Sequence, residues 1–421
     1  MEKRVEVGDL KLGMYVSELD CPWSETPFAP PGFTIRTPEQ ITQLLAQCAY
    51  VYIKTGLTTS EPEVRSDPLL DPSAFYRLDR PELELEILKK YAAPGSGQNK
   101  YHDTCSIEDE INEIRRAHKQ ALELVDDLMH AVRLGGNLDA TAAIHIVSLL
   151  ADSIIRNPDA LVCFTHLRQT HAATAEHGLR SCILALALGR HLGMAKQQLT
   201  NLGIGMLLHD IGKTRVPQEI LECGHERNEE ERRILRMHVS DGVDILESTE
   251  GIDSSSIEVA RQHHEHYDGS GYPRGLCENE ISQFGHIAAI IDRYDNLTCP
   301  LPGRRAVPPH KALKILYELR GKLFHPHLTE EFIRCMGIYP IGSIVEMRTG
   351  EVGVVIALNR MRRLKPRVSL IVGTDQSYRE RPQIVDLAHY HNQHGEALEI
   401  VRVADSNTYE FDPLDYLPVV A

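Results

Sequence analysis

The sequence predicts a mainly α-helical protein, built as a helical bundle with a small α/β domain before it and a small β-rich appendage after it. Apolar residues recur near helical spacing from Ile107 to about Met336. Short alternating or continuous apolar runs, separated by turn residues, flank that stretch on both sides and predict strands. A chain of 421 residues also exceeds one ordinary domain, so two or three globular units are expected.

Residues 1–56 predict the small N-terminal α/β domain. Val5 and Val7 are separated from the run Met14–Val16 by glycine turns, and both segments predict short strands. The segment Thr37–Gln40 predicts the opening of a short helix, because a threonine cap precedes a proline at the first helical position. The apolar run Tyr50–Ile53 predicts a closing strand.

The remaining chain divides by composition into four further parts. Residues 57–104 are rich in proline, serine and charge and predict a linker. Residues 105–160 predict connecting helices, one long helix from Ile107 and a second over 140–155. Residues 161–338 predict the bundle domain. Residues 339–421 predict the β-rich appendage, from apolar runs around 345–347, 352–356, 368–372 and 398–403.

Composition limits the partners and the compartment. A net charge of −15 disfavours binding to a nucleic acid polymer, although a bound metal ion could still attract one small anionic ligand. The nine cysteines are scattered without a CxxC pair, which is typical of a reducing compartment. The N-terminus lacks the apolar stretch of a secretory signal, and the longest apolar runs are too short to cross a bilayer. The sequence therefore predicts a cytoplasmic protein without a membrane span.

The adjacent pair His209 and Asp210 is the most informative motif. Both residues lie in the apolar run Met206–Lys213. Burial of these two polar side chains is costly unless they bind a partner. Imidazole and carboxylate together suit a divalent transition metal. Five further candidates lie in or beside separate helical segments, so they can project into one bundle core: His177, His238, His263, His264 and Asp292. Any single histidine among 21 is more often a surface or hydrogen-bonded core residue, but seven candidates together favour two metal shells bridged by Asp210.

The order of these residues resembles a known group. With HDIGK at 209–213 and HHEHYDGSGYP at 263–273, the pattern is similar to the HD-GYP subgroup of the HD phosphohydrolases over about residues 165–337. Residues 4–56 resemble a small domain that often precedes HD-GYP domains in bacteria. The resemblance implies an HD-type helical bundle and a metal-dependent phosphodiesterase that opens cyclic di-GMP to linear pGpG, with GMP as the product of a second cut.

The resemblance also implies roles for individual residues. The seven candidates would hold two divalent ions, iron or manganese, which activate water for attack on phosphorus. Asp210 and Lys213 would serve catalysis, with Lys213 facing the scissile phosphate. The substrate would be bordered by Gly269, Gly271, Tyr272, Pro273 and Arg304. Two simpler interpretations stay open, namely that Lys213 is a cation at a helix C-terminus and that the glycines form only a turn.

Three departures from the family pattern qualify these expectations. Ala173 stands where some members carry a glutamate that recruits a third metal, so two ions are expected and no third. Leu301 stands in place of an arginine that contacts phosphate, and His325 replaces the aspartate of a Phe-Asp-Pro motif. The alternative is therefore that the protein is catalytically weak and acts as a nucleotide-binding sensor or interaction module. A third candidate is an enzyme that hydrolyses another cyclic dinucleotide or a phosphoester. The N-terminal domain and the appendage are candidate surfaces for a homodimer or a signalling-protein partner.

Overall fold

In the computed structural model the chain forms two compact units, Met1–Arg77 and Leu78–Ala421. The described residues are 2–7, 10, 15–20, 33–35, 41, 43–45, 48, 50–54, 101–166, 173–222, 227–299, 306–391, 397–404 and 408–419. The predicted linker lies outside them except for residues 101–104, and so does the predicted helix opening at 37–40. The division of the chain into domains at the predicted boundaries stays a prediction.

The first unit contains an antiparallel sheet in the order β1-β4-β2-β3. Its strands are β1 (Glu2–Glu6), β2 (Tyr15–Leu19), β3 (Phe33–Thr34) and β4 (Tyr50–Lys54). Val16 and Val51 on this sheet are fully buried with Ile35 and Leu44 in a small apolar core. The strands that the sequence predicts around Val5, Val16 and Tyr50 are present, and they enclose this core.

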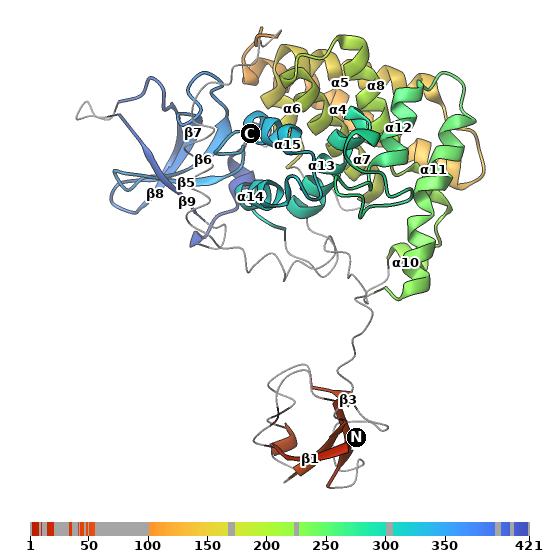
Figure 1. Ribbon diagram of the computed structural model, residues 1–421. Helices are drawn as coiled ribbons and strands as arrows, with labels where there is room; N and C mark the ends of the chain where they lie inside the picture. The colour runs from red at the N-terminus through yellow and green to blue at the C-terminus, as the bar shows by residue number, and fades with distance from the viewer. Residues whose placement is uncertain are drawn as a thin grey trace. The chain divides into compact units, whose positions relative to one another are not determined.

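The second unit is dominated by helices, which confirms the predicted mainly α-helical fold with a bundle at its centre (Figure 1). Those that surround the candidate site are α7 (Ala173–His191), α8 (Lys196–Leu208), α11 (His238–Glu247), α12 (Ser254–Gln262) and α13 (Gln283–Thr298). The others are α4 (Ile107–Arg133), α5 (Ala140–Arg156), α6 (Pro158–Phe164), α9 (Gln218–Leu221), α10 (Glu229–Arg236), α14 (Pro309–Leu319) and α15 (Pro326–Met336).

Capping residues and apolar faces explain where these helices begin and what they bury. Ser106 accepts a hydrogen bond from the Asp109 amide at 3.1 Å and starts α4, and Ser282 does the same for α13 through Gly285 at 3.0 Å. Helix α7 is nearly continuous in small and apolar residues after its first turn, and the run from Cys182 to Leu188 is buried. Because α7 is covered on most sides, it forms the centre of the bundle.

The β-rich appendage is a five-stranded antiparallel sheet in the order β8-β7-β6-β5-β9. Its strands are β5 (Ile344–Met347), β6 (Val352–Ala357), β7 (Arg367–Val372), β8 (Tyr378–Asp386) and β9 (Ile400–Ala404). The central strands β6 and β7 are almost wholly buried, as the continuous apolar runs predict. The sheet lies at the end of the bundle beside α6 and α15, where the Leu358 amide donates to Asp159 of α6 at 2.8 Å (Figure 1).

Sequence patterning missed the strand β8. Most of its residues are exposed and polar, so it lacks the apolar alternation on which the strand prediction rests. It pairs with β7 on one side only and contains Pro382, which an edge strand tolerates because no partner needs its missing amide.

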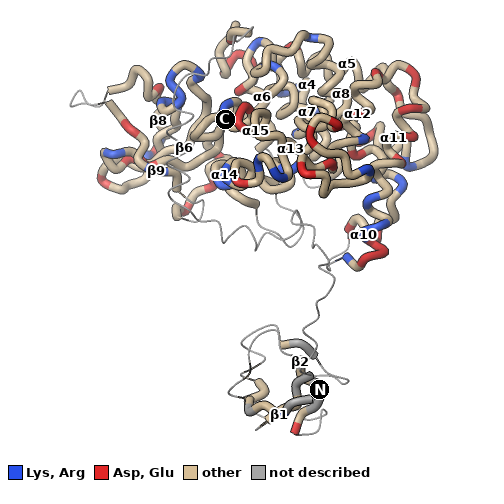
Figure 2. The backbone as a smooth tube through the Cα atoms, in the orientation of Figure 1, with Lys and Arg blue, Asp and Glu red and all other residues tan. Residues whose placement is uncertain are grey.

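Charge is mixed along the second unit, and single elements such as α10 carry both acidic and basic residues, with acids in its first turn and arginines after them (Figure 2). Among the described residues, no helix is long and apolar enough to cross a membrane.

Candidate metal centre

The seven residues singled out from the sequence come together from separate elements of the bundle. His177 lies in the second turn of α7, His209 directly follows α8, and Asp210 directly precedes the short helix η3 (Ile211–Arg215). His238 is the first residue of α11, His263 and His264 follow α12, and Asp292 lies in α13. Six of the seven are buried, and His264 is half-buried.

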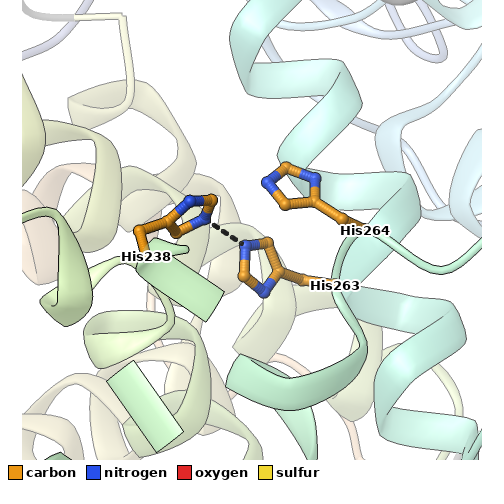
Figure 3. A group of neighbouring side chains, drawn as sticks. All are labelled: His238, His263 and His264. Atoms are coloured by element: carbon orange, nitrogen blue, oxygen red, sulfur yellow. Dashed lines mark hydrogen bonds between the residues drawn. The ribbon is translucent and has the colours of Figure 1, made fainter. Parts of the chain in front are cut away.

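These residues form two adjacent groups. In the first, His177 Nε2 lies 3.0 Å from Asp292 Oδ1 and 3.2 Å from His209 Nε2. In the second, His238 Nε2 lies 3.3 Å from His263 Nε2, and the ring of His264 lies beside both (Figure 3). Each group offers three donor atoms within 4.8 Å of one another, a spacing suited to one metal ion.

Asp210 lies between the two groups and faces each with a different oxygen. Its Oδ2 is 3.6 Å from His209 Nε2 and 3.7 Å from His177 Nε2. Its Oδ1 is 3.4 Å from His238 Nε2 and 3.8 Å from His263 Nε2. Within the described part of the chain, this buried Oδ1 has no hydrogen-bond partner, which is costly for a carboxylate oxygen. An oxygen in this position fits a metal ligand, and the two oxygens together fit a carboxylate that bridges two ions.

Hydrogen bonds to nearby backbone carbonyl groups orient three of the imidazole rings. The Nδ1 atoms of His209, His238 and His263 donate to the carbonyl oxygen three residues earlier, at 2.7, 2.6 and 2.8 Å. This contact fixes the tautomer and leaves Nε2 with its lone pair toward the centre. His177 is held differently, because its Nδ1 donates to Asp295 Oδ2 at 2.7 Å. Arg180 in turn donates to the Asp295 carboxylate at 2.9 and 3.0 Å.

Burial and neighbouring charges set the protonation of the centre. Burial lowers the pKa of His238 to about 4 and that of His263 to about 3, so both rings are neutral near pH 7, as metal ligands must be. Burial alone would raise the pKa of Asp210, but Lys213 and the surrounding imidazoles outweigh it and hold the pKa well below its usual range. Burial likewise opposes protonation of His177, yet Asp292 and Asp295 raise its pKa to about 9. A metal ion held by this ring would displace that proton.

The HDIGK segment is packed against the start of α11. A side chain at Gly212 would put its Cβ 2.0 Å from the His238 carbonyl oxygen and 2.5 Å from the Gly242 amide nitrogen. Only glycine allows this approach, which brings Asp210 next to His238. Lys213 forms an ion pair with Asp210 Oδ2, and its side chain is 26 % exposed. Its ammonium group thus lies at the edge of the centre, where solvent or a ligand can reach it.

The segment 265–277 forms a loop beside His264. The buried Glu265 carboxylate accepts hydrogen bonds from the amides of Arg274 and Leu276 at 2.8 and 2.9 Å. Gly271 packs on the backbone of His264–His266, where a Cβ would meet the His266 amide nitrogen at 2.3 Å. This fold of the loop stacks the Tyr272 ring on the His264 ring at 4.6 Å between centroids.

The other predicted loop residues flank Tyr272 or lie elsewhere. Gly269 adopts a φ of +76°, and Pro273 follows Tyr272 through a cis peptide bond. Arg304 and Leu301 lie outside the described residues. All other predicted site residues are therefore at or beside the metal centre.

Two arginines at the site escaped sequence reasoning. Arg180, one turn after His177, holds Asp295, which itself accepts a hydrogen bond from His177. Arg236 lies with its guanidinium carbon 4.9 Å from the centroid of the Tyr272 ring. The spacing from His177 to Arg180 on one helix face could have indicated the first. No sequence signal connects Arg236 to Tyr272, because 36 residues separate them.

A family model described as an HD domain matches residues 163–328, which contain every residue of this centre. This part of the chain is an HD domain of the HD-GYP type. A second model, described as a domain of unknown function, matches residues 2–143 ahead of the HD-GYP domain. The second match extends beyond the N-terminal sheet into α4 and the first residues of α5.

Curated relatives resemble the chain to different extents. A cyclic di-GMP phosphodiesterase of Pseudomonas aeruginosa is 28 % identical over 99 % of this chain and 95 % of its own length. A cyclic di-GMP phosphodiesterase of Thermotoga maritima is 35 % identical over 38 % of this chain and 44 % of its own length. A 3'3'-cGAMP-specific phosphodiesterase of Vibrio cholerae is 31 % identical over 37 % of this chain and 30 % of its own length. The HD-GYP domain thus spans less than half of the latter two relatives, whereas the first matches nearly end to end.

Proposed function

We propose that this HD-GYP protein is a metal-dependent phosphodiesterase that hydrolyses cyclic di-GMP to linear pGpG, with GMP as a second product. The observation that carries the proposal is Asp210, whose two oxygens face two separate groups of imidazole and carboxylate donors. Such a shared carboxylate is typical of two-metal sites that clamp a phosphoryl group. The relative that matches nearly the full chain is named a cyclic di-GMP phosphodiesterase, which supports the choice of substrate.

The cofactor of this proposal is a pair of divalent ions, iron or manganese, held by His177, His209, Asp210, His238, His263, His264 and Asp292. When bound, the ions supply an activated water and neutralise charge on the phosphoryl oxygens. A third ion is not part of the proposal, because Ala173 offers no ligand atom and the nearby Glu176 pairs with Arg180 at 3.4 Å. Mixed imidazole and carboxylate donors bind several first-row metals, so availability decides between iron and manganese.

The residues of the chain contribute positioning and charge. In the reaction the oxygen of water bonds to phosphorus, and the bond from phosphorus to the ribose O3′ breaks to leave a hydroxyl. Lys213, held against Asp210 and partly exposed, would stabilise the negative charge that develops on the phosphoryl or leaving oxygen. The loop with Gly269, Gly271, Tyr272 and Pro273 would border the substrate, with the Tyr272 ring stacked on His264.

Two other functions remain candidates, and one observation supports each of them. The replacement of a family arginine by Leu301 favours a protein that binds the nucleotide as a sensor with weak turnover. The similarity to an enzyme named as 3'3'-cGAMP-specific favours a different cyclic dinucleotide at the same centre. Both candidates keep the metal ligands and differ in substrate handling.

A product assay tests the proposal against both alternatives. The full chain, loaded anaerobically with Fe(II) or separately with Mn(II), would be incubated with cyclic di-GMP or 3'3'-cGAMP and the products separated by chromatography. We expect metal-dependent pGpG from cyclic di-GMP, no product from a His209→Ala/Asp210→Ala variant, and kcat lower by roughly a hundredfold in Lys213→Met with unchanged metal content. Nucleotide binding without turnover in either metal form would favour the sensor. Faster turnover of 3'3'-cGAMP than of cyclic di-GMP would identify 3'3'-cGAMP as the preferred substrate.

A further inference from the structure

A cavity lies where the β appendage meets the helical bundle. It encloses about 40 Å³ and is lined by α6, α7, α15 and the loop that follows β6. Four of the lining residues are arginines: Arg190, Arg334, Arg360 and Arg363. Arg190 and His177 are 13 residues apart on α7, which corresponds to about 20 Å along the helix axis. The cavity is therefore separate from the metal centre, although one helix borders both.

Carboxylates neutralise three of these arginines. Arg190 donates to Asp103 at 2.8 Å, and Arg360 donates to Asp103 at 2.9 Å and to Asp159 at 2.5 Å. Arg334 pairs with Glu331. These contacts hold the arginine side chains in fixed positions around the cavity, as in a preorganised anion site.

Arg363 differs from the other three. Its Nε and Nη1 atoms are buried and have no hydrogen-bond partner within the described residues. Burial, and after it the nearby Arg334, lower the pKa of Arg363, although Glu331 opposes this effect. Two buried guanidinium N–H groups without an acceptor are costly, and a bound anion would offset that cost.

We propose that this cavity is a binding site for a phosphate group, with Arg363 as its principal contact, and that the bound group fastens the β appendage to the helical bundle. An oxyanion matches guanidinium donors in charge and hydrogen-bonding capacity. Arg363 comes from the appendage, whereas Arg190 and Arg334 come from the bundle, so one anion contacts both parts. The phosphate comes either from free inorganic phosphate or from the end of a nucleotide.

The test is calorimetric titration of the full metal-loaded chain with inorganic phosphate, and separately with GMP, at constant ionic strength. We expect phosphate binding that becomes at least tenfold weaker in Arg363→Gln and intermediate in Arg363→Lys. The matched control is Arg381→Gln, since Arg381 is exposed on the edge strand β8. GMP that binds more tightly than phosphate, with the same dependence on Arg363, would identify a nucleotide as the source.

Phosphate could also bind at the metal centre, so a further variant separates the two sites. The His209→Ala/Asp210→Ala variant is expected to retain the Arg363-dependent binding. Phosphate binding that persists in Arg363→Gln but vanishes in this double variant would overturn the proposal, and so would the absence of binding to the unaltered chain. If Arg363→Gln does not fold, direct titration of the unaltered chain and of Arg363→Lys still decides. None of these outcomes depends on hydrolysis of a cyclic dinucleotide.

Discussion

Asp295 accepts a hydrogen bond from His177 Nδ1 at 2.7 Å, on the side of the ring opposite to the nitrogen that faces Asp292. Arg180 holds the same carboxylate from α7, so the acid on α13 and the histidine on α7 are oriented together. Loss of such a partner from a metal-binding histidine typically weakens metal affinity by about 10- to 100-fold.

Asp295→Ala should therefore lower metal affinity within this range while the fold is retained. The measurement is metal bound per chain at controlled free metal concentration. Asp295→Asn should be less severe, because its amide oxygen can still accept from Nδ1. Asp152→Asn, at an acid that pairs with Lys196 on the surface, is the control and should bind metal normally. Equal metal affinity in Asp295→Ala and the unaltered chain would contradict this role.

The position of Asp210 between both donor groups predicts a difference between single variants. Asp210→Ala should lose both ions, because each group loses an oxygen ligand. His177→Ala should lose the ion of its own group and retain the other to a larger extent, since His238, His263 and His264 remain together. Elemental analysis of the purified variants measures this. Equal metal loss in the two variants would mean that the groups bind cooperatively or as one site.

Replacement of Arg236 should affect substrate binding rather than the chemical step. Its guanidinium lies over the Tyr272 ring, which stacks on His264, so it is close to where an anionic substrate would approach. Arg236→Gln should raise KM by about tenfold, equivalent to about 1.4 kcal/mol, with little change in kcat. Arg233→Gln on the same helix is the matched control, because Arg233 is exposed and pairs with Glu230. A fall in kcat at constant KM would refute the assignment.

The buried histidine His118 should make the free energy of unfolding depend on pH. It is buried in α4 against Phe164, and burial lowers its pKa from 6.5 to about 4. Between these values the unfolded chain binds a proton that the folded chain does not, so the free energy of unfolding falls as the pH falls from 6.5 towards 4. From pH 7 to pH 5 this residue should cost roughly 2 kcal/mol of stability.

His118→Leu removes that titration, and its free energy of unfolding should decline less between pH 7 and pH 5 than that of the unaltered chain. Urea unfolding at both pH values measures the difference. His130→Leu serves as a control, because His130 is an exposed residue of the same helix. Identical pH dependence in His118→Leu and the unaltered chain would show that His118 is not protonated on unfolding in this range.

The sequence predicted those features that depend on local pattern. The helices α4 and α5 follow apolar spacing, and the metal ligands follow a motif that the chain carries in full. The strand β8 was missed because its sequence is polar and its pairing depends on β7. The stacking of Arg236 on Tyr272 and the cavity at Arg363 join segments distant along the chain, so no local pattern could indicate them.

The orientation of the histidine rings has a consequence for the order of assembly during folding. His209, His238 and His263 are aimed by carbonyl oxygens three residues away, so each is ready once its own helical turn has formed. His177 is aimed only after α13 has docked on α7, since Asp295 belongs to α13. We therefore expect the donor group with His238, His263 and His264 to capture its ion first, and the group with His177 to mature last, when the bundle closes.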